Sequence, residues 1–281
     1  MPRATARPAK RPKLGQNFLS DQSAAEKIVA SLGDIRSSIV IEIGPGGAML
    51  TSKLAAKTGR LIAIELDRVL AAQLSLRFSR QPNVEIIEAD VLTVDIANLI
   101  ARKPDPILHL PQAQKAKVIG NLPYYITSDI LLHLFHFHEW ISEIVIMVQR
   151  EVADRIAAKP GSRDYGLLSA TAQMYARVEN LFTLPPGAFT PPPKVHSSVL
   201  RLMMAPRIAE LGIETEPFVE FLKLSFGQKR KTLLNNLKSN YDPAAVRAAL
   251  KSQRLREDVR AEAMPLEKAA GVFRKLTQNP E

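Results

Sequence analysis

Residues 38–51 read Ser-Ile-Val-Ile-Glu-Ile-Gly-Pro-Gly-Gly-Ala-Met-Leu-Thr, and this stretch decides the fold class. Residues 38–43 form a short, almost continuous apolar run, as is typical of a strand buried on both faces of a sheet. The glycine-rich residues 44–48 follow at once, and residues 49–57 then show a helical pattern. A strand, a tight glycine turn and a helix in this order predict a parallel α/β sheet that binds a ligand at the turn.

The same alternation of strands and helices continues along the chain. Strands are expected at residues 38–43, 60–65, 84–89, 117–120, 143–148, 178–184 and 197–204. The last two flank a proline-rich loop and predict an antiparallel pair at the sheet edge. After Pro206 the apolar residues fall at helical spacing. We therefore expect three parts: a basic flexible arm (1–14), a Rossmann-like domain with a mostly parallel seven-stranded sheet (15–205) and a small all-helical domain (206–281).

Composition narrows the class of partner. The chain of 281 residues carries a formal net charge of +10, which favours a polyanion such as ribosomal RNA or DNA. The basic arm could lie on phosphates, as could residues 223–238, which include Lys229, Arg230 and Lys231 and contain no acid. We therefore expect the helical domain (206–281) to bind RNA. The alternative for both segments is a solvated surface without a ligand.

Several classes of protein are disfavoured. The sequence has no cysteine, which excludes disulfides, thiolate metal sites and a cysteine nucleophile. No apolar run reaches the roughly 18 residues that span a membrane, and the N-terminus lacks the apolar region of a secretory signal. His133 and His136 are three residues apart without a carboxylate or cysteine beside the pair, so we favour packing over a metal site. We expect a cytoplasmic protein that neither associates with a membrane nor binds a metal ion.

The ends of the first three strands carry groups that suit a nucleoside cofactor. The turn from Gly44 lets a ligand approach the backbone, Glu65 can accept both hydroxyls of a ribose, and Asp90 can accept from an adenine amine. A dinucleotide is the first alternative, but Met49 stands where its fingerprint requires a glycine or alanine. The Glu-x-Gly-x-Gly pattern beginning at Glu42 fits S-adenosylmethionine better.

The end of the fourth strand, Asn121-Leu122-Pro123-Tyr124, suits a flat heterocycle with an exocyclic amine. The amide oxygen of Asn121 and the carbonyl of Leu122 can accept both amine hydrogens. Pro123 fixes the backbone of the turn, and Tyr124 can stack on the ring of a base drawn out of its helix. The alternative is a plain turn in which Tyr124 belongs to the core.

These motifs together resemble those of the KsgA/RsmA family of ribosomal RNA adenine dimethyltransferases, over nearly the whole chain. The matching segments are residues 16–19 (Gln-Asn-Phe-Leu), 42–51, 121–124, 148–153, 164–166 (Asp-Tyr-Gly), 189–199 and 226–233. The resemblance implies a class I S-adenosylmethionine-dependent methyltransferase. It would dimethylate two adjacent adenosines in the 3′-terminal hairpin loop of small-subunit (16S) rRNA, on free RNA or on an immature 30S particle. We take a monomer as the default.

The resemblance also assigns roles to single residues. Asn17 and Leu19 would lie at the edge of the cofactor, Gly44 by its methionine part, Glu65 by the ribose and Asp90 by the adenine. Asn121 would stand between the cofactor and the target base. Phe189 would back the flipped adenine opposite Tyr124.

The sequence departs from the family pattern in two places. The family has a further glycine where Ala48 stands and a leucine where Gly47 stands, and we expect Gly47 to restore the lost backbone freedom. The insertion at residues 102–115 is longer than expected and precedes the strand that leads to Asn121.

Two other functions remain open from the sequence. One is a large-subunit rRNA adenine methyltransferase of the macrolide-resistance type. The other is a non-catalytic RNA-binding factor in assembly or transcription that keeps the cofactor fold. The intact residues 121–124, together with Glu65 and Asp90, favour catalysis.

Overall fold

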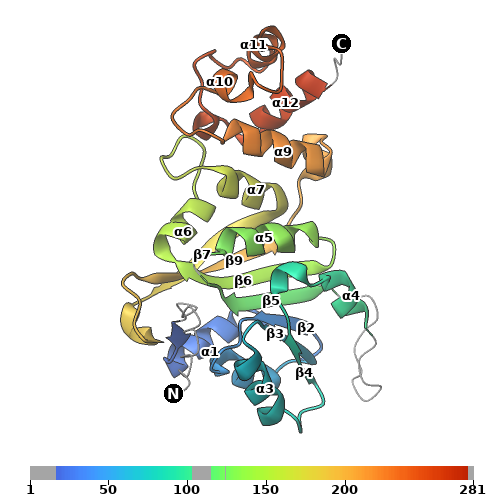
Figure 1. Cartoon of the computed structure of the whole chain (residues 1–281), viewed down its shortest axis with the longest axis vertical. Coiled ribbons are helices and arrows are strands. Elements are labelled where there is room, and N and C mark those ends of the chain that lie inside the picture. Colours follow the sequence, from blue (N-terminus) through green and yellow to red (C-terminus); the bar gives the residue numbers. More distant parts are fainter. Residues whose placement is uncertain (1–16, 103–114, 124, 278–281) are drawn as a thin grey trace, which may run out of the picture.

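The computed structural model describes residues 17–102, 115–123 and 125–277. The predicted basic arm, most of the 102–115 insertion and Tyr124 lie outside these residues. A seven-stranded sheet forms the centre of the molecule, in the order β4-β3-β2-β5-β6-β9-β7 (Figure 1). Its strands are β2 (Ile39–Ile43), β3 (Arg60–Glu65), β4 (Val84–Glu88), β5 (Ala116–Asn121), β6 (Ile141–Gln149), β7 (Ala176–Leu184) and β9 (Ser197–Met204).

The five strands β4, β3, β2, β5 and β6 are parallel, while β9 runs antiparallel to both β6 and β7. The predicted mostly parallel seven-stranded sheet, with its antiparallel pair at one edge, is therefore confirmed. The chain builds outward from β2 through β3 to β4, and then returns to the other side of β2 with β5. The carboxyl ends of β2 and β5 thus meet where the strand order reverses, which is where open α/β sheets bind ligands.

Helices cover both faces of the sheet. They are α1 (Gln22–Ala30), α2 (Met49–Ala55), α3 (Arg68–Arg77), α4 (Ile96–Ala101), α5 (Thr127–His136), α6 (Arg150–Ile156) and α7 (Leu167–Tyr175). The two-residue period of β2 sends Ile39, Ile41 and Ile43 toward the cluster that includes α4 to α7, and Val40 toward the cluster that includes α1 to α3. No helix in the described ranges is long and apolar enough to cross a membrane.

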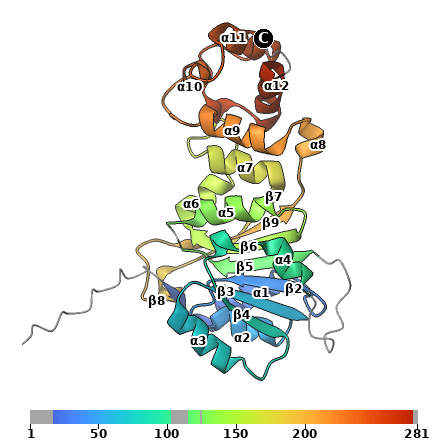
Figure 2. The ribbon, with the colours of Figure 1, turned by 45° about the vertical axis from the view of Figure 1, so that its right-hand side comes forward.

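The strands end at Met204, and only helices follow: α8 (Ile208–Leu211), α9 (Thr215–Ser225), α10 (Leu233–Leu237), α11 (Pro243–Ser252) and α12 (Leu266–Thr277). They form one end of an elongated molecule (Figure 2). Phe218, Phe221 and Phe273 pack their rings together at the centre of this helical part. That it is a separate domain beginning at residue 206 stays a prediction.

The loop between α6 and α7 connects the sheet and its covering helices to the helical part that follows Met204. The amide of Gly161 donates to the carbonyl of Glu262 at 2.7 Å, and Lys229 donates to the carbonyl of Arg163. The buried ring of Tyr165 meets Phe226 edge-on, with 6.0 Å between centroids. These contacts tie the helical part to the loop that leaves the sheet layer.

A second, two-stranded sheet was not expected from the sequence. β1 (Phe18–Leu19) pairs antiparallel with β8 (Phe189–Thr190), so that Leu19 lies opposite Phe189. The amides of Ser20 and Asp21 both donate to the carbonyl of Ala188, extending the pairing. Local sequence patterns do not predict β1, because its partner strand lies about 170 residues later in the chain.

Helix α11 ends in an unusual way. The amide of Arg254 bonds to the carbonyl of Lys251, and that of Leu255 bonds to the carbonyl of Leu250, both at 3.0 Å. This pair of bonds is a Schellman motif, in which the residue after the C-cap takes a left-handed conformation that favours glycine. Here that residue is Arg254, with φ of 55°, and the conformation costs a non-glycine residue about 1–2 kcal/mol.

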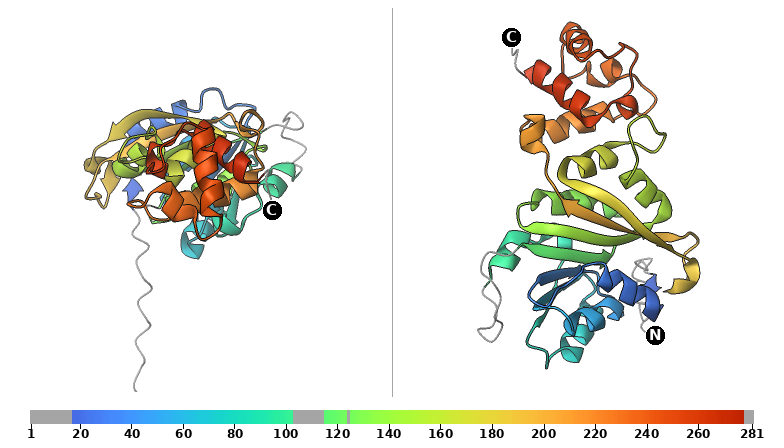
Figure 3. Two further views of the ribbon diagram at one scale, coloured as in Figure 1. Left: turned by 90° about the horizontal axis from the view of Figure 1, so that it is seen from above. Right: turned by 180° about the vertical axis from the view of Figure 1, so that it is seen from behind.

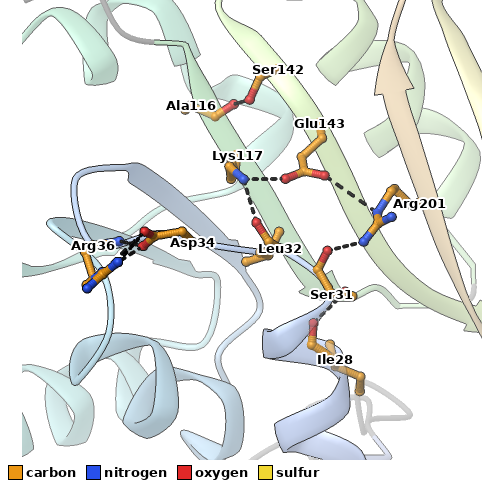
Figure 4. A network of polar contacts seen from close by, with 10 residues as sticks. All are labelled: Ile28, Ser31, Leu32, Asp34, Arg36, Ala116, Lys117, Ser142, Glu143 and Arg201. Atoms are coloured by element: carbon orange, nitrogen blue, oxygen red, sulfur yellow. Dashed lines mark hydrogen bonds and ion pairs between the residues drawn. The ribbon is translucent and has the colours of Figure 1, made fainter. Parts of the chain in front are cut away.

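The amino end of the sheet holds α1 through a polar network (Figure 4). Lys117 on β5 and Arg201 on β9 both pair with Glu143 on β6, at 2.7 and 3.7 Å. The same two cations donate to the carbonyls of Leu32 and Ser31, which follow α1. Two positive charges therefore stand at the negative end of the helix dipole.

We expect Glu143→Ala to lower the free energy of unfolding by about 2 kcal/mol, since Lys117 would keep a partly buried charge without a carboxylate and Arg201 would keep only its pair with Glu179 at 3.5 Å. The side chain of Glu143 is 14% exposed and those of its partners 22% and 26%. Chemical denaturation measures the change. The matched control is Asp34→Ala, which breaks the exposed pair with Arg36 and should leave the midpoint unchanged. Equal losses in both variants would contradict this account.

Candidate active site

A pocket opens where the parallel strands end. It is lined by residues that follow β2, β3, β4 and β5: Ile43, Gly44, Ile64, Glu65, Leu66, Ala89, Asp90, Val91, Pro123, Tyr125, Ile126 and Ile130. Gly44, Glu65 and Asp90, which the sequence placed around a nucleoside cofactor, thus line one pocket. The sequence did not single out Tyr125, whose side chain is exposed beside the turn after β5.

Glu65 holds the glycine-rich turn in place. Its carboxylate accepts the amide of Gly46 at 3.0 Å through Oε2 and the amide of Asp67 at 2.9 Å through Oε1. The residue is 2% exposed, so both bonds are shielded from water. Each carboxylate oxygen has a second lone pair, which leaves Glu65 able to accept ligand hydroxyls as well.

Two glycines of the turn need their left-handed backbone. Gly44 has φ of 67° and Gly46 has φ of 51°. A Cβ on Gly46 would stand 2.8 Å from two ring carbons of Phe18, so the ring of Phe18 packs directly on the turn. Phe18 is therefore a neighbour of the cofactor loop that sequence reasoning missed, although it lies inside the matching segment 16–19.

The expectation for Gly47 was wrong. Gly47 is not among the residues with positive φ, whereas Ala48 itself adopts a left-handed conformation, with φ of 64°. Ala48 precedes α2 and is 2% exposed, so its methyl is accommodated in the core next to α1 and α2. The strain is borne by Ala48 and not relieved at Gly47.

Asp90 has a structural bond in addition to its place in the pocket. Its Oδ1 accepts the amide of Leu92 at 3.0 Å and so caps the short 3₁₀ helix Val91–Thr93. The cap fixes the carboxylate at the end of β4, beside Ala89 and Val91 in the pocket wall.

Asn121 is oriented by Asn17. Its Nδ2 donates to the main-chain carbonyl of Asn17 at 2.9 Å. A carbonyl can only accept, so the amide nitrogen must face Asn17 and the amide oxygen must point elsewhere. The preceding Gly120 allows this strand to approach β2, since a Cβ there would stand 2.7 Å from the carbonyl of Ile43. Leu122 is buried, and its backbone amide donates to the main-chain carbonyl of Met147 at 3.1 Å.

Leu19 and Phe189 lie apart from the pocket wall. They face each other across the β1–β8 ribbon, 7% and 2% exposed, in the core cluster that includes α1. Tyr124, the predicted stacking partner, lies outside the described residues. The roles assigned to these three side chains, like those assigned to the other site residues, stay predictions.

The basic run and the histidines have ordinary structural contacts. Lys223 pairs with Glu220 at 2.6 Å. His133 contacts the carbonyl of Val94 and His138 that of Phe135, both at 3.0 Å. Across the described residues no group of three or more metal-binding side chains comes together.

Glu42 is a buried acid behind the turn. It is 1% exposed, and its Oε2 has no hydrogen-bond partner among the described residues. Burial raises the pKa of Glu42 to about 8; neighbouring Thr51 works against the rise, and the negative charge of Glu65 adds to it. Glu42 is therefore neutral at pH 7. The second carboxylate beside the turn, that of Glu65, instead accepts hydrogen bonds from the amides of Gly46 and Asp67.

The two glycines provide a matched pair for testing the turn. Gly46→Ala should lower the free energy of unfolding by about 1–3 kcal/mol, because the new methyl collides with Phe18 at a left-handed position. Gly47→Ala meets nothing within 4 Å and should leave stability equal or slightly higher. Urea denaturation of both variants measures the difference, and equal stabilities would count against the packing of Phe18 on the turn.

Glu42→Gln tests the buried acid. The folded protein holds the proton up to about pH 8, whereas an exposed glutamate loses it near 4.5, so Glu42 makes stability fall with rising pH between those values. The thermal midpoint of Glu42→Gln, relative to the natural protein, should therefore rise from pH 5 to pH 8 and then level off. A difference that is independent of pH would show that Glu42 titrates normally.

The chain is similar to known proteins over almost its whole length. The family model for ribosomal RNA adenine dimethylase matches residues 7–278. "Ribosomal RNA small subunit methyltransferase A" of Koribacter versatilis is 59% identical over 273 residues and 96% of each chain. The protein of the same name from Acidobacterium capsulatum is 53% identical, over 95% of this chain and 91% of its own.

Among solved structures, a dimethyladenosine transferase from Plasmodium falciparum has the same fold. Its TM-score is 0.76 at 22% identity, and the match covers 93% of this chain and 98% of that one. The architecture is that of a class I S-adenosylmethionine-dependent methyltransferase, as predicted. The match of the family model over almost the whole chain, with two relatives above 50% identity, shows that this chain belongs to the ribosomal RNA adenine dimethylase family.

Proposed function

We propose that this enzyme transfers methyl groups from S-adenosylmethionine to the exocyclic amines of two adjacent adenosines in the 3′-terminal hairpin loop of small-subunit (16S) rRNA. One observation carries the proposal: Gly44, Glu65 and Asp90 line a single pocket, and Pro123, from the turn that begins at Asn121, lines it as well. The relatives above 50% identity are named as small-subunit rRNA methyltransferases.

The chain's residues fit S-adenosylmethionine. The buried carboxylate of Glu65 has acceptor capacity for a ribose, and Asp90 lines the same pocket. Apolar side chains, among them Ile64 and Ile126, line the rest of the pocket and suit the faces of an adenine ring. When bound, the cofactor supplies an electrophilic methyl group on a sulfonium.

Asn121 and Leu122 would activate the target amine. Its lone pair is delocalised into the adenine ring, which makes it a poor nucleophile. Hydrogen bonds from its two N–H groups to the amide oxygen of Asn121 and the carbonyl of Leu122 favour a pyramidal nitrogen and free the lone pair. Since little acid–base help is needed, positioning supplies most of the acceleration.

The bond from Asn121 to Asn17 prepares this arrangement. With its nitrogen committed to the carbonyl of Asn17, the side chain offers its oxygen to the amine without first having to rotate. The same orientation serves the second methylation, in which one N–H remains to be held. Tyr124 and Phe189 would enclose the flipped adenine.

The substrate is proposed to be rRNA, free or within an immature 30S particle, bound by a cytoplasmic monomer that takes part in small-subunit biogenesis. The net charge of +10 supports a polyanionic substrate. Part of that charge lies on Arg230 and Lys231, both exposed in the loop between α9 and α10.

The test is transfer of labelled methyl from S-adenosylmethionine to small-subunit particles that lack dimethyladenosine. Asn121→Ala should lower the rate on the order of 100-fold or more, because both the acceptor and its fixed orientation are lost. Binding of S-adenosylhomocysteine, measured by calorimetry, should be retained. Asn98→Ala, which removes an exposed amide on α4, is the matched control and should transfer at the normal rate.

The outcomes separate the candidate functions. Dimethyladenosine in small-subunit RNA alone supports the proposal. Label in large-subunit RNA would assign the enzyme to the macrolide-resistance type. Salt-sensitive binding of particles without any label would leave a non-catalytic RNA-binding factor.

A further inference from the structure

Another cavity lies where three helices meet, between the helices that cover the sheet and the helical part. Figures 1 and 3 show α7 between α9 and α5 along the long axis of the molecule. All three helices line this junction cavity, with side chains that include Leu132, His136, Tyr175, Glu216, Val219 and Glu220. Ile130, near the amino end of α5, lines the cofactor pocket, whereas His136 ends the same helix at the junction cavity.

One carboxylate of the junction cavity has no cationic partner. Glu220 pairs with Lys223 at 2.6 Å, so these two charges balance each other. Glu216 is exposed, and it forms no ion pair or side-chain hydrogen bond with another described residue. The cavity therefore has one unmatched negative charge, although the formal net charge of the chain is +10.

The ends of the helices add to this negative potential. His136 is the last residue of α5 and Tyr175 is the last residue of α7, so two helix carboxyl ends lie at the cavity. Each carries roughly half a negative charge, while the amino end of α9, at Thr215, carries roughly half a positive one. The balance attracts a cation and repels a phosphate.

Tyr175 supplies a polar group that the fold itself does not use. The residue is 4% exposed, and its ring lies 5.0 Å from that of Phe135 and 5.1 Å from that of His138. Its hydroxyl forms no hydrogen bond with another described residue. Burial and the negative charge of Glu216 raise the pKa of Tyr175 to about 12, so the hydroxyl stays protonated. Because neighbouring rings hold the side chain, this hydroxyl is fixed in place at the cavity.

We propose that the junction cavity binds one guanidinium group on an aliphatic stem, as an arginine side chain or a free alkylguanidine carries it. A guanidinium offers five N–H donors in one plane. The cavity offers the two oxygens of Glu216, the hydroxyl of Tyr175 and a ring nitrogen of neutral His136 as acceptors. Leu132 and Val219 supply apolar surface for the stem.

The size of the cavity and its charges disfavour other ligands. Its volume of about 210 Å³ is below the roughly 300–1,000 Å³ of sites for drug-sized molecules, and suits a single side chain. A phosphate would meet Glu216 and Glu220, so the cavity is not a contact for RNA. The inference goes beyond the proposed function and does not depend on methyl transfer.

NMR titration of the ¹⁵N-labelled full chain tests the inference. The first probe is a blocked pentapeptide with arginine at its centre and glycine elsewhere. We expect a dissociation constant of about 1 mM, with shifts centred on amides of α5, α7 and α9. The same peptide with citrulline in place of arginine keeps the shape without the charge, and should bind at least about tenfold more weakly.

A second probe, n-propylguanidine, separates the two sources of the ligand. It carries the guanidinium and the stem without a peptide backbone. Affinity equal to that of the peptide would assign the cavity to a free alkylguanidine, because the backbone then adds nothing. Tighter binding of the peptide would assign it to an arginine side chain of a partner protein.

Two variants separate binding from folding. Glu216→Gln removes the unmatched charge and should weaken binding of the arginine peptide about tenfold. Tyr175→Phe removes only the hydroxyl and should weaken it about three- to tenfold, while the thermal midpoint stays unchanged because that hydroxyl bonds to no described residue. Glu214→Gln, which removes an acid just before α9 that does not line the cavity, is the control for loss of one negative charge.

Three results would overturn the inference. The first is an absence of shifts around the junction cavity at about 10 mM arginine peptide. The second is equal binding of the arginine and citrulline peptides. The third is a Glu216→Gln protein that binds as well as Glu214→Gln. Failure of the proposed function is a separate result, in which the protein binds the arginine peptide but transfers no methyl group.

Discussion

The carboxylate of Glu65 connects the parts on which the site depends. It stands at the end of β3 and accepts the amide of Gly46, in the turn that follows β2. This bond joins neighbouring strand ends and sets the turn in the left-handed form that only small residues tolerate. The pocket is thereby shaped before a ligand arrives, which spares the cost of ordering a loop on binding.

The turn is held on its outer side as well. Phe18 packs on Gly46, and the next residue, Leu19, faces Phe189 across the β1–β8 ribbon. Just before this strand, the carbonyl of Asn17 receives the amide nitrogen of Asn121. Residues 17–19 therefore touch the glycine-rich turn, orient Asn121 and pair with β8, the strand that carries Phe189. The same short segment would therefore support both the turn that holds the cofactor and the side chain that holds the target base.

The amino end of the sheet, opposite the pocket, secures this arrangement. Lys117 and Arg201, paired through Glu143, hold the carbonyls that follow α1, the helix that continues from β1. Buried ion pairs gain little over apolar packing but fix geometry when each charge has its partner. The network thus anchors the helix whose amino end leads back to Asn17.

The sequence alone determined the layers, the strand ends and the groups placed there. Buried runs such as β2 and β3 are read from local pattern, and parallel strands bring Gly44, Glu65 and Asp90 to one edge by topology. Only the tertiary structure decided the partners. The ribbon between β1 and β8 and the bond from Asn121 to Asn17 depend on contacts between distant segments, which no local pattern records.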